Sequence, residues 1–136
     1  MPSHLLLLVA AKQLHAMARP EQVADNVAII RRAIRDRMCL SGTYAAFRVR
    51  FAPHALARDE NGRQIVVAFE YGGMTLGRAQ WACFEVHRLR ALQPNGDRWR
   101  SSLVESRPQF DLTEIEVAVD DSWSGKPAPA VRAADD

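Results

Sequence analysis

Apolar residues recur at helical spacing in the first third of the chain. Between Pro20 and Met38 they are separated by four, three, four and four residues, and the stripe consists of Val23, Val27, Ile30, Ile34 and Met38. This spacing places one apolar face on an α-helix, and a proline at its start suits the first helical turn. Residues 4–18 also have a helical pattern. The sequence therefore predicts two N-terminal helices, the second of which ends at Ser41-Gly42.

In the second third of the chain the apolar period shortens to two, which is typical of β-strands. In the run TYAAFRVRF, apolar side chains alternate with Arg48 and Arg50. Further runs rich in β-branched and aromatic residues follow at 63–71, 81–89 and 111–119, and the turn sequences DENG and PNGD separate them. About five short strands with tight turns favour a small barrel or a strongly bent antiparallel sheet, and hence an α+β fold.

These elements divide the chain into three expected parts. N-terminal helices within residues 1–41 are expected to pack on a β-domain that spans residues 42–121. Residues 122–136 are low in apolar bulk and rich in proline and alanine, so they are expected to form a disordered tail.

Charge is distributed unevenly along the chain. Residues 31–100 contain 13 arginines, no lysine and six acidic residues, a net charge of +7, whereas residues 105–136 have a net charge of −5. A genome rich in G and C would explain the excess of arginine over lysine. The alternative is a central region suited to anions, because the planar guanidinium group contacts phosphate or carboxylate at two points.

Motifs for catalysis and metal binding are missing from the sequence. The four histidines and the two cysteines show no ligand spacing, and neither a GxSxG motif nor a phosphate-binding loop occurs. We therefore expect a protein that is not an enzyme and that uses no cofactor or metal. Cys39 and Cys83 lie in apolar runs and are expected to be buried, reduced thiols of a cytoplasmic protein. The apolar run Leu5–Ala11 is too short to span a membrane.

Polar side chains on the expected strands are the candidates for ligand binding. In chain order they are Tyr44, Arg48, Arg50, His54, Arg88 and Arg90. Arginine gives two-point contacts to phosphate, tyrosine offers a stacking surface for a base, and histidine gains charge near neutral pH. The alternative is that these are ordinary outward residues of half-exposed strands and that His54 is a packed histidine at a strand end.

Several segments occur in an order found in a known family. An arginine-rich helix passes into a strand tyrosine in AIRDRMCLSGTY, and FAPHAL, DENG, VVAFEYGG and WACFEVHRLRAL follow. This order resembles the WYL domain of bacterial transcriptional and phage-defence regulators, over roughly residues 28–93. The resemblance implies that the strands form a small SH3-like or Sm-like barrel.

The resemblance also implies a function. The ligand-contacting positions of the family correspond to Tyr44, His54 and Arg88, with Arg48 as a further contact. WYL domains bind nucleic acid or a nucleotide-like effector and act as sensors that switch an attached DNA-binding module. No helix-turn-helix is expected ahead of this barrel, so we expect a standalone sensor, a subunit that works with a partner protein, or a degenerate relative whose site has lost its function.

Two departures from the family pattern bear on this interpretation. The tripeptide that names the family is replaced by Gln64-Ile65-Val66, and His87 stands where the family has an acidic residue before its arginine. The second change removes the expected acidic partner of Arg88. A structural or protein-interaction subunit without a small-molecule ligand, such as a homodimer, is the alternative function.

Overall fold

The fold combines one helix with one antiparallel sheet. The computed structural model describes residues 19–73, 79–101 and 110–123. Within them lie α2 (Pro20–Asp36), β1 (Leu40–Tyr44), β2 (Phe47–Asp59), β3 (Gln64–Gly73), β4 (Gln80–Glu85), the 3-10 turn η1 (Val86–Arg88), β5 (Leu89–Pro94) and β6 (Leu112–Ala118). The prediction of a mixed helix-and-strand protein is confirmed. The helix expected over residues 4–18 lies outside the described residues.

Helix α2 begins where the sequence predicted and ends earlier. Pro20 occupies the first turn, together with the acidic Glu21. At the other end, Arg37 adopts a left-handed conformation with a φ of 53°, and its N–H points to the carbonyl groups of the last turn. The prediction that Ser41-Gly42 ends the helix is therefore wrong, because this dipeptide lies inside β1.

The first expected strand is a hairpin of two strands. β1 pairs with the start of β2 from Leu40 opposite Phe51 to Tyr44 opposite Phe47. The two residues of the turn, Ala45 and Ala46, have φ values of 48° and 76°. Such a turn normally contains asparagine or glycine, so the alanines gave no signal that the chain reverses here.

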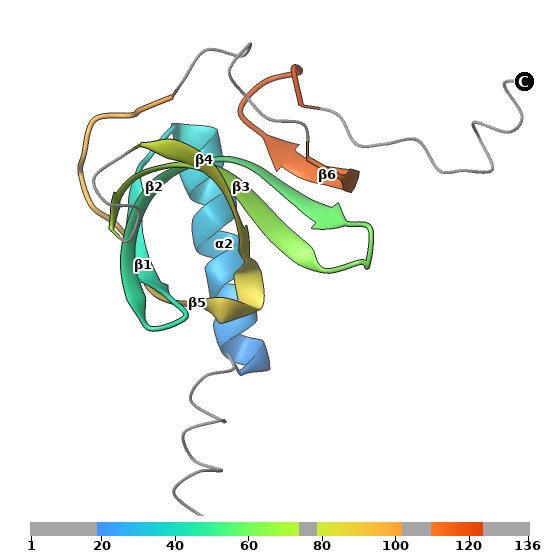
Figure 1. Ribbon diagram of the computed structural model, residues 1–136, viewed down its shortest axis with the longest axis horizontal. Helices are drawn as coiled ribbons and strands as arrows, with labels where there is room; N and C mark the ends of the chain where they lie inside the picture. The colour runs from blue at the N-terminus through green and yellow to red at the C-terminus, as the bar shows by residue number, and fades with distance from the viewer. Residues whose placement is uncertain (1–18, 74–78, 102–109, 124–136) are drawn as a thin grey trace, which may run out of the picture.

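The long strand β2 organises the sheet. Its first half pairs with β1 and its second half with β6, whereas β3 follows its other edge, and the overall strand order is β4-β3-β2-β1-β5. Figure 1 shows the strands curving around one side of α2, with β1 and β6 alongside opposite halves of β2. Among the described residues no pairing joins the outer strands β4 and β5, so the sheet is not closed.

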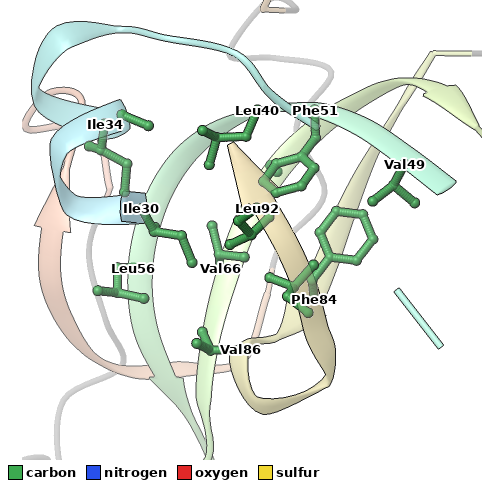
Figure 2. Close-up of a cluster of buried hydrophobic side chains, with 13 residues drawn as sticks. Ile30, Ile34, Leu40, Val49, Phe51, Leu56, Val66, Phe84, Val86 and Leu92 are labelled. Carbon is green, nitrogen blue, oxygen red and sulfur yellow. The ribbon is translucent and has the colours of Figure 1, made fainter. Parts of the chain in front are cut away.

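The main core lies between α2 and the sheet. Its fully buried residues include Ile30 and Ile34 from the helix and Leu40, Phe51 and Leu56 from the strands. Figure 2 shows the two isoleucines pointing toward the strand residues. Burying these aliphatic and aromatic side chains contributes about 1.5–3 kcal/mol each, and the apolar stripe predicted from the sequence supplies the contacts of the helix.

A second, smaller core cluster lies beside the C-terminal half of β2. Its buried members are Ala55, Ala57, Ile65, Val67, Leu112 and Trp123. Trp123 belongs to the segment that was expected to be a disordered tail, yet its side chain is buried. Residues 124–136, the remainder of that segment, lie outside the described residues.

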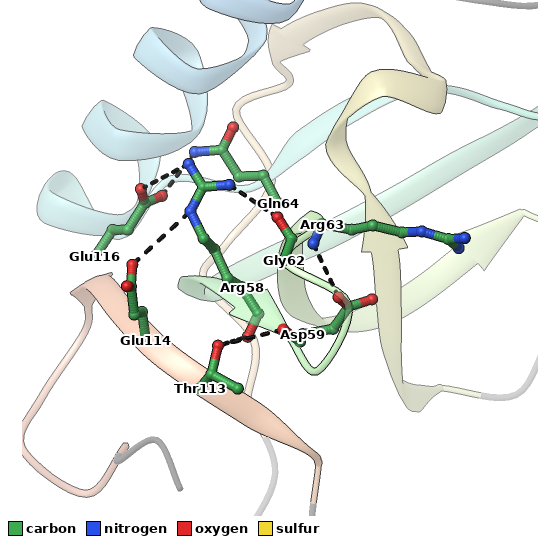
Figure 3. Close-up of polar contacts among 8 residues, drawn as sticks. All are labelled: Arg58, Asp59, Gly62, Arg63, Gln64, Thr113, Glu114 and Glu116. Atoms are coloured by element: carbon green, nitrogen blue, oxygen red, sulfur yellow. Dashed lines mark hydrogen bonds and ion pairs between the residues drawn. The ribbon is translucent and has the colours of Figure 1, made fainter. Parts of the chain in front are cut away.

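Polar contacts hold β6 against the β2–β3 hairpin. The Arg58 guanidinium donates to the carbonyl oxygen of Gly62 at 2.9 Å and lies 3.8 Å from both Glu114 and Glu116. Figure 3 shows Arg58 between these three acceptors. Gln64 adds a hydrogen bond of 2.6 Å to Glu116. The acidic strand β6 is therefore partly neutralised by the strand that it pairs with.

Candidate anion-binding face

Arginines from neighbouring strands meet on the outer face of β1. Residues directly opposite one another in antiparallel strands point to the same side. Thr43 lies opposite Arg48 of β2 and Arg90 of β5, and Ser41 lies opposite Arg50 of β2. We call these five residues the β1 face. The alternating residues Leu40 and Tyr44 belong to the main core or pack against it.

A cleft opens on the β1 face. Its volume is about 350 Å³, and its lining contains the hydroxyl groups of Ser41 and Thr43, the guanidinium groups of Arg48 and Arg50, and the amide of Gln93. None of the residues that line it is acidic. The cleft is near the lower end of the size range of small-molecule sites, and its composition favours an anion.

A bulge in β5 shapes the floor of the cleft. β5 uses one residue more than β1 between Ser41 opposite Gln93 and Thr43 opposite Arg90, and Ala91 in this stretch has a φ of 54°. Bulges are common where a strand re-aims a side chain. A methyl group on Gly42 would lie 2.8 Å from Leu92 Cδ2 and 2.9 Å from the Arg90 carbonyl oxygen. Only glycine therefore allows β5 to approach this closely.

Two arginines of the β1 face have no counter-charge within the described residues. Arg48 is exposed and takes part in no ion pair there. Arg90 is partly buried, and its Nη2 atom is buried without any hydrogen-bond acceptor. A buried N–H group without an acceptor costs about 1–3 kcal/mol. Such groups call for an explanation, and an anionic ligand would provide one.

Tyr44 and Arg88, two of the predicted site residues, are in contact. The Arg88 guanidinium lies 5.3 Å from the centre of the Tyr44 ring, a cation–π arrangement. The Tyr44 hydroxyl accepts the backbone N–H of Glu85 at 3.1 Å. The Glu85 carboxylate lies 3.6 Å from Arg88, so the expectation that Arg88 lacks an acidic partner is wrong. Arg88 lies in η1 rather than in the strand of Arg90, which the sequence pattern did not reveal.

Asn26 fixes the position of η1 and β5. This side chain is only 3% exposed within the apolar face of α2. Its Nδ2 atom donates to the carbonyl oxygens of Val86 at 3.2 Å and Leu89 at 2.8 Å. The Val86 carbonyl oxygen also accepts the backbone N–H of Leu89. Asn26 thereby orients the segment that presents Arg88 and Arg90.

A tyrosine that sequence reasoning missed supports Arg50. The Tyr71 hydroxyl donates to Asp97 at 2.7 Å and accepts from Asn95 at 3.0 Å. The guanidinium groups of Arg50 and Arg100 lie 5.7 and 4.3 Å from the centre of its ring. Burial and the hydrogen bond to Asp97 raise the pKa of Tyr71 well above its usual value. The phenol therefore stays protonated, and Tyr71 contributes an aromatic surface without adding negative charge.

His54 lies in the core and away from these groups. It is 3% exposed and sits at a bulge of β2, between Pro53 opposite Ala68 and Ala55 opposite Val67. All three tryptophans of the chain surround it, with ring centres at 4.8 Å for Trp81 and Trp99 and 6.2 Å for Trp123.

The hydrogen bonds of His54 define its tautomer. Nδ1 lies 2.8 Å from the carbonyl oxygen of Ala52, and Nε2 lies 2.7 Å from the Ser101 hydroxyl. Since a carbonyl group can only accept, Nδ1 carries a proton. No contact between described residues joins His54 to Tyr44, Arg48 or Arg88. The alternative interpretation as a packed histidine fits this arrangement better than a ligand contact.

Part of the β1 face was predictable from the sequence. The alternation of Arg48 with Arg50 correctly placed both arginines on one side of a strand. The roles of Ser41 and Thr43 were missed, because they depend on which strands flank β1. Arg48 and Arg90 both lie opposite Thr43 because β1 pairs with β2 on one edge and with β5 on the other. This pairing cannot be recognised from any local sequence pattern.

Other chemistry has little support in the described part of the chain. Those residues contain no group of three or more histidine, cysteine or acidic side chains that could hold a metal ion. Cys39 is buried, as expected, whereas Cys83 is exposed, and neither forms a disulfide. No helix among residues 19–73, 79–101 and 110–123 is both long and apolar enough to cross a membrane.

Comparisons with known proteins give no assignment. No family model matches the chain, and no curated protein and no solved structure matches it.

Proposed function

We propose that this protein is a non-enzymatic module that binds nucleic acid or a nucleotide-type anion. The contacts are made by the β1 face together with Tyr44 and Arg88. One observation carries the proposal: Arg48 and Arg90 flank Thr43 beside an acid-free cleft, and no acidic side chain of the described residues pairs with either arginine. Positive charge that the protein leaves uncompensated is available to an anion.

Each group has a chemical role in this function. Guanidinium groups contact phosphate oxygens at two points, and they retain their charge at all physiological pH values. The Arg88 guanidinium contacts the Tyr44 ring on the core side of β1, and the pair is the proposed aromatic and cationic surface for a base, since nucleic-acid bases stack on such surfaces. His54 has no contact role in the proposal, because its ring is enclosed by the three tryptophans.

The resemblance to WYL domains supports the same function, and with it a sensor role. On this proposal the bent sheet corresponds to an SH3-like or Sm-like barrel. The register shifts in β2 between Arg50 and Phe51 and between Pro53 and Ala55 support it, because small barrels bend their long strands at bulges. Ligand binding would then bias a partner protein between two states by differential affinity.

Fluorescence anisotropy with short single-stranded DNA and RNA tests the proposal. Affinity is expected to fall as salt rises, because bound phosphates release counterions. Replacing either cationic group, in Arg48→Gln or Arg88→Gln, is expected to weaken binding about tenfold. Arg32→Gln is the matched control, since Arg32 lies on α2 and pairs with Asp36. The absence of salt-dependent binding to any oligonucleotide or mononucleotide would contradict the proposed function.

One observation favours the alternative of a protein-interaction subunit. Phe47 at the β1–β2 turn is 50% exposed, and it is the one exposed large apolar side chain among the described residues. A homodimer formed through this turn predicts a doubled mass in light scattering and a monomer for Phe47→Ser. A monomeric wild-type protein would count against this alternative.

A further inference from the structure

Thr43, in the lining of the cleft, lies between two arginines of the neighbouring strands. Arg48 and Arg90 are the two cross-strand neighbours of Thr43, so their Cα atoms are separated by two strand spacings, about 10 Å. Arginine side chains are long enough to reach over Thr43 from both sides. Thr43 and Arg48 line the cleft, whereas Arg90 lies beside it with its Nη2 atom buried.

The hydrogen-bonding capacity of these groups is not used within the described residues. Arg90 Nη2 has no acceptor. The Ser41 hydroxyl accepts from Asn95 Nδ2 at 2.9 Å, which leaves its own hydrogen available to donate. A ligand with several acceptor oxygens would satisfy all of these donors. Charge-assisted hydrogen bonds of this kind are stronger than those between neutral groups.

We propose that the cleft binds a phosphomonoester group, held between Arg48 and Arg90 with Thr43 beneath it. This inference rests on the proposed function and specifies its ligand. A phosphomonoester carries a charge of about −1.5 to −2 at neutral pH, whereas the phosphodiesters within a strand carry one charge each. Two unpaired arginines and no acidic lining residue match the doubly charged group better. Binding requires the Arg90 guanidinium to turn toward the cleft, which its partly exposed side chain permits.

Two ligands share this chemistry. One is a mononucleotide and the other is the phosphorylated end of a nucleic-acid strand. A cleft of about 350 Å³ bounded by the bulge of β5 has room for one terminal group with its sugar. In either case the base would extend beyond the cleft.

Matched oligonucleotides with and without a terminal phosphate test the inference. Affinities of the full chain are measured by anisotropy for 3′-labelled single-stranded DNA with a 5′-phosphate or a 5′-hydroxyl, and by calorimetry for AMP and adenosine. The 5′-phosphate is expected to increase affinity about tenfold or more, which corresponds to one charge-assisted contact. Arg90→Gln is expected to abolish this increase, whereas Arg88→Gln weakens both DNAs by a similar factor. Thr43→Val, which preserves shape, is expected to remove part of the increase.

The outcomes separate the two proposals. Equal affinity for phosphorylated and unphosphorylated DNA would overturn the phosphomonoester site and leave the proposed function intact. Binding of AMP but of neither DNA would support the site and identify a mononucleotide as the ligand. An increase that survives Arg90→Gln in a variant with wild-type thermal stability would overturn the assigned position. If none of the four ligands binds, both proposals fail.

Discussion

The two ends of β2 each have arginines beside a tight turn, but they differ in how far the charges and the turn residues are stabilised. At the C-terminal end, Arg58 contacts one carbonyl group and two carboxylates. The adjoining turn contains Gly62 in a left-handed conformation with a φ of 78°, and the Asp59 carboxylate accepts the N–H groups of Asn61 and Arg63 at 2.9 Å. At this end the charge of Arg58 is therefore compensated, and the turn contains residues that suit its backbone conformation.

The N-terminal end of β2 is less completely satisfied, although Arg50 lies 3.8 Å from Asp97 there. Arg48 has no ion pair among the described residues, Arg90 nearby has a buried nitrogen without an acceptor, and the turn forces two alanines into positive φ values. Unfavourable features of this kind persist where the surrounding structure enforces them, and they are concentrated at binding sites. The N-terminal end of β2 is therefore the better candidate for a binding site.

The largest expected effect comes from the contact that holds the unsatisfied end in place. Asn26→Ala removes two buried hydrogen bonds, to the carbonyl groups of Val86 and Leu89, so we expect the free energy of unfolding to fall by about 2–3 kcal/mol. The loss should be independent of salt, because the hydrogen bonds involve no charge. Gln22→Ala, on the same helix, should change stability by less than about 0.5 kcal/mol. Urea unfolding of both variants measures the effect, and equal losses would show that Asn26 anchors nothing.

Much of the fold could be predicted from the sequence, but the difference between the two ends of β2 could not. The stripe of α2 and the turn DENG follow from local spacing and turn chemistry, and both are confirmed. The hairpin at Ala45-Ala46 was missed because its residues oppose the turn that they form. Local propensity fails at this point because β1 pairs on both sides, with β2 and with β5, and tertiary contacts impose the reversal.

The candidate site was predictable in the same partial way. Alternation identified Arg48 as outward-facing, and the order of segments pointed to Tyr44 and Arg88, which the fold brings together. His54 could not be placed, because its burial depends on tryptophans that lie 27, 45 and 69 positions further along the chain. The acidic partner of Arg88 was sought at the preceding residue, yet one turn of η1 brings Glu85 into contact instead.

Replacing the two alanines of the β1–β2 turn should relieve its backbone strain, which the turn at the other end of β2 does not have. The double variant Ala45→Asn with Ala46→Gly provides residues that favour positive φ, so we expect a gain of about 1–2 kcal/mol in the free energy of unfolding. The reverse change at the other end is the control: a methyl group on Gly62 meets no atom within 4 Å, so Gly62→Ala should cost about 1 kcal/mol through backbone strain alone. Thermal unfolding measures both. A neutral double variant would mean that the alanine turn is not strained.

Methionine in place of Arg58, at the C-terminal end of β2, and in place of Arg90, in β5 near the N-terminal end, should change the free energy of unfolding in different directions. Arg58→Met is expected to lose about 1 kcal/mol at low salt and less at high salt, since its ion pairs are 40% exposed on the arginine side. Arg90→Met retains the apolar stem and removes a buried N–H group without an acceptor, so stability should stay the same or rise by about 1 kcal/mol. Urea unfolding at two salt concentrations measures both. A clear loss for Arg90→Met would show that Arg90 serves folding rather than a ligand.

The smallest expected effect concerns Glu70, the acidic counterpart of Arg90. Glu70 is 4% exposed and lies opposite Phe51, and no ion pair or hydrogen bond from the described residues reaches its carboxylate. Burial raises the pKa of Glu70 above its ordinary value of 4.5. The folded protein therefore binds a proton more tightly than the unfolded chain, and this contribution to stability is present at low pH and is lost as pH rises through the raised pKa.

Glu70→Gln should abolish that pH dependence. The variant is expected to be more stable than the wild type at neutral pH, with the advantage shrinking toward pH 4 as the wild-type carboxyl group becomes protonated. Glu60→Gln, in the exposed turn, is the control and should show no such trend. Chemical unfolding at intervals between pH 4 and 8 measures the difference. An advantage that is constant with pH would mean that the Glu70 carboxylate is compensated in the folded state. The uncompensated charges near the N-terminal half of β2 would then be those of Arg48 and Arg90, with no negative charge among them.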